Sequence, residues 1–146
     1  MKLDPSAFVA DSDLIQELEP YSSPIYCGKD RVLFRQGDRP AGLYILNKGE
    51  ATLVTSAPQS GEATFTQASP GSVFGLSGLI FNESATLTVI ARKGAQITFV
   101  SRANFYHLVQ TSPRLSLLQV LANEVRILSQ KLLHANADLS AVAAVL

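Results

Sequence analysis

The feature that most limits how this chain can fold is a series of short apolar and β-branched runs between Arg31 and Ser101. Turn-forming residues, such as Gln36-Gly37-Asp38, separate these runs at intervals of about ten residues. Short strands at this spacing predict an antiparallel barrel or sandwich, and the lack of alternating strands and helices argues against a parallel sheet. The expected strands are residues 32–34, 43–46, 51–55, 63–67, 85–91 and 96–101.

Both ends of the chain have helical periodicity instead. A short helix is expected over residues 11–19, and another around Phe105 and Leu108, which share one face. Ser112 then has the character of an N-cap, and Pro113 suits the first position of a further helix. Since neither Pro nor Gly follows, this last helix is predicted to run for about thirty residues.

The last predicted helix has a narrow apolar stripe. Apolar residues recur at alternating steps of three and four up to Leu146, which is the a/d pattern of a coiled coil. A continuous helix of this length would exceed about 40 Å and overrun its own domain, so we expect self-association as a homodimer rather than packing on the chain's own strands. A break near Ala137-Asp138, where a new N-cap pattern begins, is the alternative to a continuous helix. The predicted dimer interface consists of Leu118, Leu121, Val125, Leu128 and Leu132.

Length, charge and cysteine content restrict the class of protein. The chain has 146 residues, of which 47% are hydrophobic, as expected for one folded domain. Its 12 Lys and Arg balance 12 Asp and Glu, which argues against direct binding of nucleic acid. Cys27 is a single cysteine, so an intrachain disulfide is excluded and a cytoplasmic location fits. Neither a signal peptide nor a membrane span is recognisable, and no membrane partner is expected.

Catalytic patterns are missing from the sequence. His107 and His134 both lie on predicted helices, and neither has a cysteine or paired carboxylate at ligand spacing nearby. The sequence also lacks a nucleophile elbow, a phosphate-binding P-loop and a zinc-protease motif. We therefore predict no catalytic and no metal-binding residues, and we do not expect an enzyme.

A glycine-rich stretch, residues 69–79, is the strongest local signal of a binding site. It begins with Pro70-Gly71 and has two more glycines, Gly75 and Gly78. Glycine suits positive φ or close approach to the backbone, and a loop that leads into a helical turn presents free N–H groups to an anion. The stretch is therefore either a phosphate-binding loop or a tight structural corner between two strands.

Three glycine-containing motifs lie among the predicted strands. They are Arg31-Val32-Leu33-Phe34-Arg35-Gln36-Gly37-Asp38, Leu43-Tyr44-Ile45-Leu46-Asn47-Lys48-Gly49-Glu50-Ala51 and Pro70-Gly71-Ser72-Val73-Phe74-Gly75. Together they resemble the cyclic-nucleotide-binding domain of the Crp/Fnr family of bacterial transcription regulators, over about residues 20–135. The resemblance implies a mainly β protein with some α: an antiparallel, jelly-roll-like β-roll, flanked by short helices and a long C-terminal dimerisation helix. In the family, a winged helix-turn-helix follows that helix.

Two ligand contacts implied by the resemblance are missing here. In members that bind cyclic AMP, a Glu after Phe-Gly holds the ribose hydroxyl, and an Arg before a (Ser/Thr)-Ala pair binds the cyclic phosphate. Leu76 and Ala85 occupy these two positions. We therefore expect no binding of cyclic AMP in the usual way and no certain cofactor. The candidate pocket consists of Phe74, Gly75, Leu76, Ser77, Gly78, Ala85, Thr86, Leu87 and Ser129.

Two functions remain open at this point. The domain is either a regulatory sensor, in which a small-molecule effector biases the long helix, or a non-sensing scaffold whose pocket is closed by side chains. The chain is also either a stand-alone domain or the effector half of a longer DNA-binding regulator. The expected organisation is a helical segment (1–20), a β-roll (21–101) and C-terminal helices (102–146).

Overall fold

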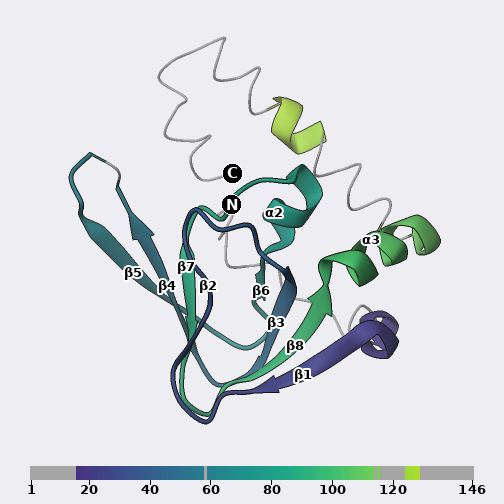
Figure 1. Ribbon diagram of the computed structural model, residues 1–146, viewed down its shortest axis with the longest axis horizontal. Helices are drawn as coiled ribbons and strands as arrows, with labels where there is room; N and C mark the ends of the chain where they lie inside the picture. The colour runs from purple at the N-terminus through teal and green to yellow at the C-terminus, as the bar shows by residue number, and fades with distance from the viewer. Residues whose placement is uncertain (1–15, 58, 114, 116–123, 129–146) are drawn as a thin grey trace.

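The computed structural model describes residues 16–57, 59–113, 115 and 124–128, and in these ranges the chain forms two four-stranded sheets (Figure 1). In one sheet the strand order is β1-β8-β3-β6, and in the other it is β2-β7-β4-β5. All paired strands are antiparallel. The strands are β1 (Ser22–Tyr26), β2 (Arg31–Phe34), β3 (Gly42–Lys48), β4 (Ala51–Ser56), β5 (Ala63–Ala68), β6 (Val73–Phe74), β7 (Thr88–Ala91) and β8 (Gln96–Ser101). The predicted antiparallel β-roll is confirmed.

Apolar side chains form two cores, one on each side of the first sheet. The inner core lies within the roll and includes Phe34, Tyr44 and Ile97. The outer core lies between the first sheet and the helices, and it includes Ile45, Val100 and Phe105. Alternate residues of β3 and β8 therefore enter different cores, which explains why β3 is buried over five consecutive positions.

Three short helical elements accompany the sheets: η1 (Glu19–Tyr21), α2 (Leu76–Phe81) and α3 (Arg102–Thr111). Both α2 and α3 lie against β3. The side chain of Ser101 caps α3 by accepting a hydrogen bond from the Asn104 N–H at 3.2 Å. Ser112 acts as predicted at the next helix start, since its Oγ accepts a 3.5 Å hydrogen bond from Leu115 N–H.

The helix predicted over residues 11–19 falls partly outside the described residues, and residues 16–18 are helical before η1 begins. Most of the predicted long helix, including its possible break near Asp138, also lies outside the described residues. Within it, residues 124–128 are described and are helical. Among the residues that the structure describes, no helix combines the length and apolarity needed to span a membrane.

The strand predicted over residues 85–91 begins later than expected, because β7 starts at Thr88. Ala85 bonds instead to the connection between β2 and β3: its N–H donates to Asp38 O at 2.7 Å, and its C=O accepts from Gly37 N–H at 2.8 Å. These bonds hold residues 85–87 away from the β4–β7 ladder. The prediction was wrong here because β-branched composition does not reveal which backbone partner a segment meets.

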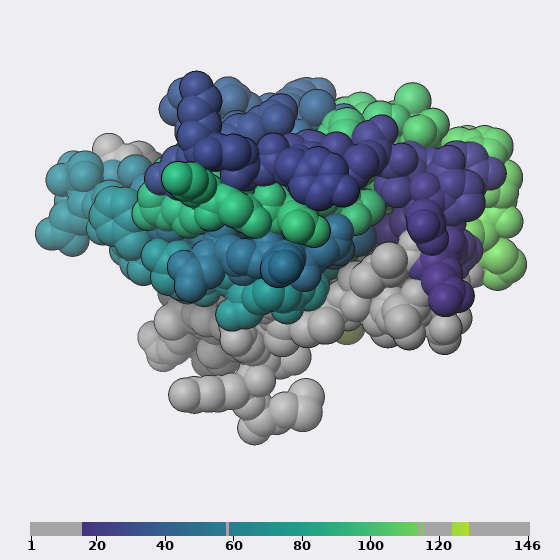
Figure 2. All heavy atoms as spheres, turned by 90° about the horizontal axis from the view of Figure 1, so that it is seen from below, coloured from purple at the N-terminus to yellow at the C-terminus, as the bar shows by residue number. Residues whose placement is uncertain are grey.

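The hairpin of β4 and β5 projects from the body of the roll (Figures 1 and 2). Five of the six residues of β5 are exposed, and Phe65 is 67% exposed. Because β5 is the edge strand of its sheet, its outer backbone groups have no partner within that sheet.

Gly75 has a backbone conformation and a location that exclude a side chain. Its φ is +88°, and a Cβ atom added there would lie 2.6 Å from the carbonyl oxygen of Gly42. Gly37 has a similar φ of +92°, but a Cβ there would meet no atom within 4 Å. Comparing the two glycines therefore separates the cost of positive φ from the cost of a backbone clash.

We expect Gly75→Ala to lower the free energy of unfolding more than Gly37→Ala does. Both substitutions incur the cost of a left-handed backbone, about 1–2 kcal/mol. Gly75→Ala adds a clash with β3, and overpacking of this kind costs about 1–3 kcal/mol more. Urea denaturation of the two variants measures the difference, and equal losses would show that α2 can move away from β3 without cost.

A polar network ties together the turns at the lower end of the roll in Figure 1. The backbone N–H of Lys93 donates to Asp30 at 2.8 Å, and Arg92 forms an ion pair with the same carboxylate at 2.9 Å. The Lys93 bond, followed by the Arg92 bond, holds the pKa of Asp30 below its ordinary value of 3.8.

A lowered pKa in the folded state means that the Asp30 carboxylate stabilises the fold above about pH 4, and that this contribution disappears as the pH falls through the folded-state pKa. We therefore expect Asp30→Asn to lower the melting temperature at pH 7, with the difference from wild type shrinking below pH 4. Thermal melts from pH 7 to pH 3 test this. Asp38→Asn is the control, since Asp38 accepts one longer bond, 3.3 Å, from Arg35 N–H. A difference that stays constant with pH would contradict the assignment.

Candidate functional site

The candidate site is the segment that joins β6 to β7, residues 74–87, with α2 at its centre. This segment lies at the upper end of the roll in Figure 1, opposite the β1–β2 turn. Phe74 is buried in the inner core and pairs with Tyr44 across β6 and β3. We call residues 74–87 the ligand loop, because they include most of the predicted pocket residues.

The glycines of the ligand loop face protein rather than open space. Gly75 approaches the Gly42 carbonyl, as described above. A Cβ atom on Gly78 would lie 3.0 Å from Pro40 Cδ and 3.1 Å from the Glu83 carbonyl oxygen. Gly75 thus lets α2 lie directly on the start of β3, and Gly78 lets it lie on Pro40, which comes just before β3. Of the two interpretations of this stretch, these contacts favour the structural corner over a phosphate-binding loop.

The two residues predicted to replace the family's charged groups pack against different cores. Leu76 packs against the outer core with Leu79, whereas Ala85 and Leu87 pack against the inner core. Ser77 and Thr86 are exposed. The ligand loop therefore presents apolar groups to the roll and hydroxyl groups to solvent. The last predicted pocket residue, Ser129, lies outside the described residues.

An aromatic cluster lies inside the roll, around Phe74's neighbour Tyr44. The ring centroid of Tyr44 is 5.7 Å from that of Phe34 and 4.9 Å from that of Phe99. Burial raises the pKa of the Tyr44 phenol, and the charge of Arg31 partly offsets this. The phenol is therefore neutral at physiological pH and adds no charge to the interior of the roll.

The end of α2, formed by Phe81, Asn82 and Glu83, is held by two arginines, and we call these three residues the α2 tip. Arg39, from the β2–β3 connection, donates to Asn82 Oδ1 at 3.0 Å. Arg126 forms an ion pair with Glu83, and its guanidinium carbon lies 4.5 Å from the ring centroid of Phe81. From α3, the Tyr106 hydroxyl also donates to the Leu79 carbonyl at 3.1 Å.

Sequence reasoning did not single out Arg39, Tyr106 or Arg126. Arg126 lies beside the predicted dimer interface residues, but their spacing gives no indication that it contacts the ligand loop. Of the predicted interface residues, Val125 and Leu128 are described, and they are 49% and 57% exposed. Leu118, Leu121 and Leu132 lie outside the described residues.

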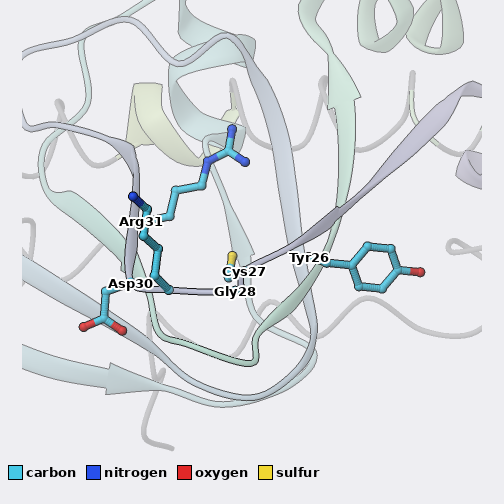
Figure 3. Close-up of a pocket in the computed structure, with 6 residues that line it drawn as sticks. Tyr26, Cys27, Gly28, Asp30 and Arg31 are labelled. Carbon is cyan, nitrogen blue, oxygen red and sulfur yellow. The ribbon is translucent and has the colours of Figure 1, made fainter.

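A shallow pocket lies at the opposite end of the roll from the ligand loop, lined by residues 26–31 (Figure 3). The side chains of Tyr26, Asp30 and Arg31 point in different directions from the turn and do not converge on a common point. The Asp30 carboxylate is already bonded to Arg92 and Lys93. The residues of this pocket thus stabilise a turn, and they show no convergent polar groups of the kind that a ligand site requires.

Several solved structures share this fold. The catabolite activator protein of Thermus thermophilus matches with a TM-score of 0.63 and 20% identity, over 92% of this chain and 60% of its own length. The N-terminal domain of a transcriptional regulator from Streptomyces coelicolor matches with a TM-score of 0.64 and 20% identity, over 84% of this chain and 87% of that one. The c-di-GMP-responsive global regulator of Xanthomonas campestris matches with a TM-score of 0.61 and 22% identity, over 84% of this chain and 60% of that one.

These likenesses establish the fold, and the chain spans 60% of the length of the Thermus protein. No curated protein matches the sequence. The family model of the cyclic nucleotide-binding domain matches residues 24–112, from β1 to the end of α3. This range contains the last three residues of β1, the whole of β2 to β8 and the whole ligand loop. The chain therefore belongs to the cyclic nucleotide-binding domain family.

Proposed function

We propose that this chain is a regulatory domain of Crp/Fnr type whose ligand loop has lost the usual contacts to cyclic AMP. The observation that carries the proposal is the packing of Leu76 and Ala85. Each stands where family members that bind cyclic AMP have a charged contact, and each is packed against an apolar core. A charged side chain at either position would have to leave that core, so apolar packing and the usual ligand contacts exclude each other.

The loss of affinity for cyclic AMP is expected to be large. Hydrogen bonds to charged groups contribute about 1.5–3 kcal/mol each, and an Arg–phosphate pair is often bidentate. Removing both contacts therefore weakens binding by about a thousandfold or more. Arg92 and Lys93 do not replace the missing Arg, because both lie in a turn at the other end of the roll. There the Arg92 guanidinium pairs with Asp30, and the backbone N–H of Lys93 donates to the same carboxylate.

The effector class that best fits the remaining groups is a small molecule that is uncharged or largely apolar. Ala85 and Leu87 are only partly buried and supply apolar surface beside the inner core, and the exposed Thr86 between them supplies a hydroxyl group. Leu76 and Ser77 supply the same two kinds of group beside the outer core. The fold is compatible with ligands other than cyclic AMP, since the similar Xanthomonas protein is described as responsive to c-di-GMP.

The dimer remains part of the proposal. Leu128 is more than half exposed although it is a large apolar residue, and Val125, one turn earlier, is half exposed. Arg126 reaches the roll from the same helical turn. Because successive helical residues are about 100° apart, Leu128 points about 200° away from Arg126. Leu128 is thus directed away from the chain's own roll, which supports a partner helix from a second copy.

A non-sensing scaffold is the second candidate function. The contacts of Gly75 with β3 and of Gly78 with Pro40 support it, because they leave no room for a ligand between α2 and these residues. In this case the roll and the long helix serve as a dimeric platform. Either candidate function is compatible with this chain being the effector half of a longer DNA-binding regulator.

Calorimetric titration with cyclic AMP tests the altered site. We expect no binding with a dissociation constant below about 100 μM, given the missing contacts. Leu76→Glu combined with Ala85→Arg is expected to create measurable binding, and Ser77→Glu combined with Thr86→Arg is the control with the same added charges at exposed neighbouring positions. A dissociation constant in the micromolar range for the natural chain would refute the proposal.

Analytical ultracentrifugation tests the dimer. Leu121→Asp together with Leu128→Asp is expected to give a monomer, because two charges would enter an apolar seam and be desolvated. Ile127→Asp is the control, since Ile127 is 44% exposed and lies off the predicted stripe. If the double variant remains a dimer, the stripe is not the interface.

A further inference from the structure

The edge strand β5 lacks the features that usually keep a sheet edge from pairing with another strand. Among the described residues, the sheet edges are β1, β6, β2 and β5. Of these, β1 contains Pro24, β6 has only two residues, and β2 begins with the charged Arg31 and has a register shift. Such features discourage the addition of a further strand. By contrast, β5 has six residues without proline or charge, and it pairs with β4 in one unbroken register.

Phe65 lies on the outer face of this edge strand. Ala68 of β5 and Ala51, its partner in β4, both belong to the inner core. Because side chains alternate between the faces of a strand, Phe65 points to the face opposite that of Ala68. Its ring is 67% exposed, on the hairpin that projects from the roll (Figure 1). The middle of the open edge therefore carries a large apolar group in contact with solvent.

Hydrogen bonds near the tip of the hairpin determine which backbone groups of β5 face outward. The Ala57 N–H donates to the Glu62 carbonyl at 3.0 Å, so these two residues form a bonded pair of the ladder. Ser56, one residue earlier, directs its N–H and its C=O away from β5, to the side chain of Gln36. Bonded and non-bonded pairs alternate in an antiparallel ladder. Since the register of β4 and β5 does not shift, this alternation continues along the whole hairpin.

Alternate residues of β5 therefore face β4 and the open edge. Thr64 and Thr66 belong to bonded pairs with β4. The residues whose N–H and C=O groups point toward the open edge are Ala63, Phe65 and Gln67. Phe65 thus combines an exposed ring with an outward donor and acceptor near the centre of the strand.

We propose that β5 pairs antiparallel with β5 of a second copy of this chain, with Phe65 at the two-fold axis. In this register the two Phe65 rings lie opposite each other, and Thr64 of each copy lies opposite Thr66 of the other. Aromatic pairs and threonine pairs are favourable cross-strand neighbours. Because β5 is uncharged, pairing with itself brings no like charges together. The near symmetry of the strand about Phe65 is what makes a second copy the matching occupant of this edge.

This strand pairing is separate from the proposed helix dimer, because it uses the β4–β5 hairpin and no residue of the apolar stripe. One pair of six-residue strands is a small interface, so we expect it to form only at about 100 μM and above. It would then join helix dimers into larger assemblies. Sedimentation at low micromolar concentration reports the helix interface alone.

Disulfide cross-linking of the full chain under mild oxidation tests the register. Positions 64 and 66 of opposite copies should lie about 4.5 Å apart at Cα, whereas position 64 lies about 7–8 Å from position 64 of the other copy. Only the shorter distance suits a disulfide. An equimolar mixture of Thr64→Cys and Thr66→Cys should therefore give at least about fivefold more covalent dimer than either variant alone. The natural chain, in which Cys27 is buried, gives the background. No gain in the mixture would overturn the second copy as the occupant of this edge.

Sedimentation over a concentration series tests the part played by Phe65. Phe65→Lys replaces the aromatic pair with two like charges, and it should weaken the association seen above about 100 μM by about tenfold or more. Thr55→Lys is the matched control, since it adds the same charge to an exposed position of the same hairpin, on β4 and away from the open edge. Unchanged association in Phe65→Lys, or an equal loss in Thr55→Lys, would overturn the proposal. Circular dichroism verifies that both variants remain folded.

The cross-linking experiment repeated in the Leu121→Asp, Leu128→Asp background separates strand pairing from the helix dimer. The gain in the mixture should persist there, because β5 is unchanged. A gain that disappears with the helix substitutions would show that the hairpins meet only through the helices, and would overturn pairing of β5 as an interface of its own.

Discussion

The position of the ligand loop depends on a close approach of backbones that leaves no room for side chains. Gly42 at the start of β3 lies against Val100, and a Cβ atom on Gly42 would be 2.1 Å from the Val100 carbonyl oxygen. Gly75 at the start of α2 lies against Gly42 in turn. The neighbouring strands β8 and β3 and the start of α2 thereby approach one another at backbone distance. Neighbouring side chains then occupy the two cores on either side of the first sheet.

This arrangement separates the shape of the ligand loop from its chemistry. The glycines that set the path of the loop are present in this chain. Val89 and Ala91, which follow the loop in β7, are fully buried. Leu76 and Ala85, at the positions predicted to have lost the charged ligand contacts, pack against apolar cores. A loop whose path is fixed by backbone contacts tolerates such changes, because its conformation does not depend on the side chains that meet a ligand. The fold is therefore a family property, whereas the ligand is a property of this chain.

The two ends of the roll differ in what their polar groups do. At the β1–β2 end, Asp30, Arg92 and Lys93 bond to one another within the roll and brace its turns. At the ligand-loop end, Arg39 and Arg126 connect the roll, the loop and a helix from the C-terminal third. Groups bonded within one rigid body contribute to stability. Groups that bridge parts able to move relative to one another can also transmit a change of position.

The sequence by itself determined the strands, the turns and the missing charges, since these depend on residues close together in the chain. Short apolar and β-branched runs separated by turn residues predicted β2 to β5 and β8. The resemblance to the Crp/Fnr family singled out Leu76 and Ala85. Only the tertiary structure decided where β7 begins, because the bonds of Ala85 go to Gly37 and Asp38. It alone also revealed the contacts of Arg39 and Arg126 with the α2 tip. Arg39 and Asn82 are 43 residues apart, as are Glu83 and Arg126, and contacts over such separations leave no local pattern to recognise.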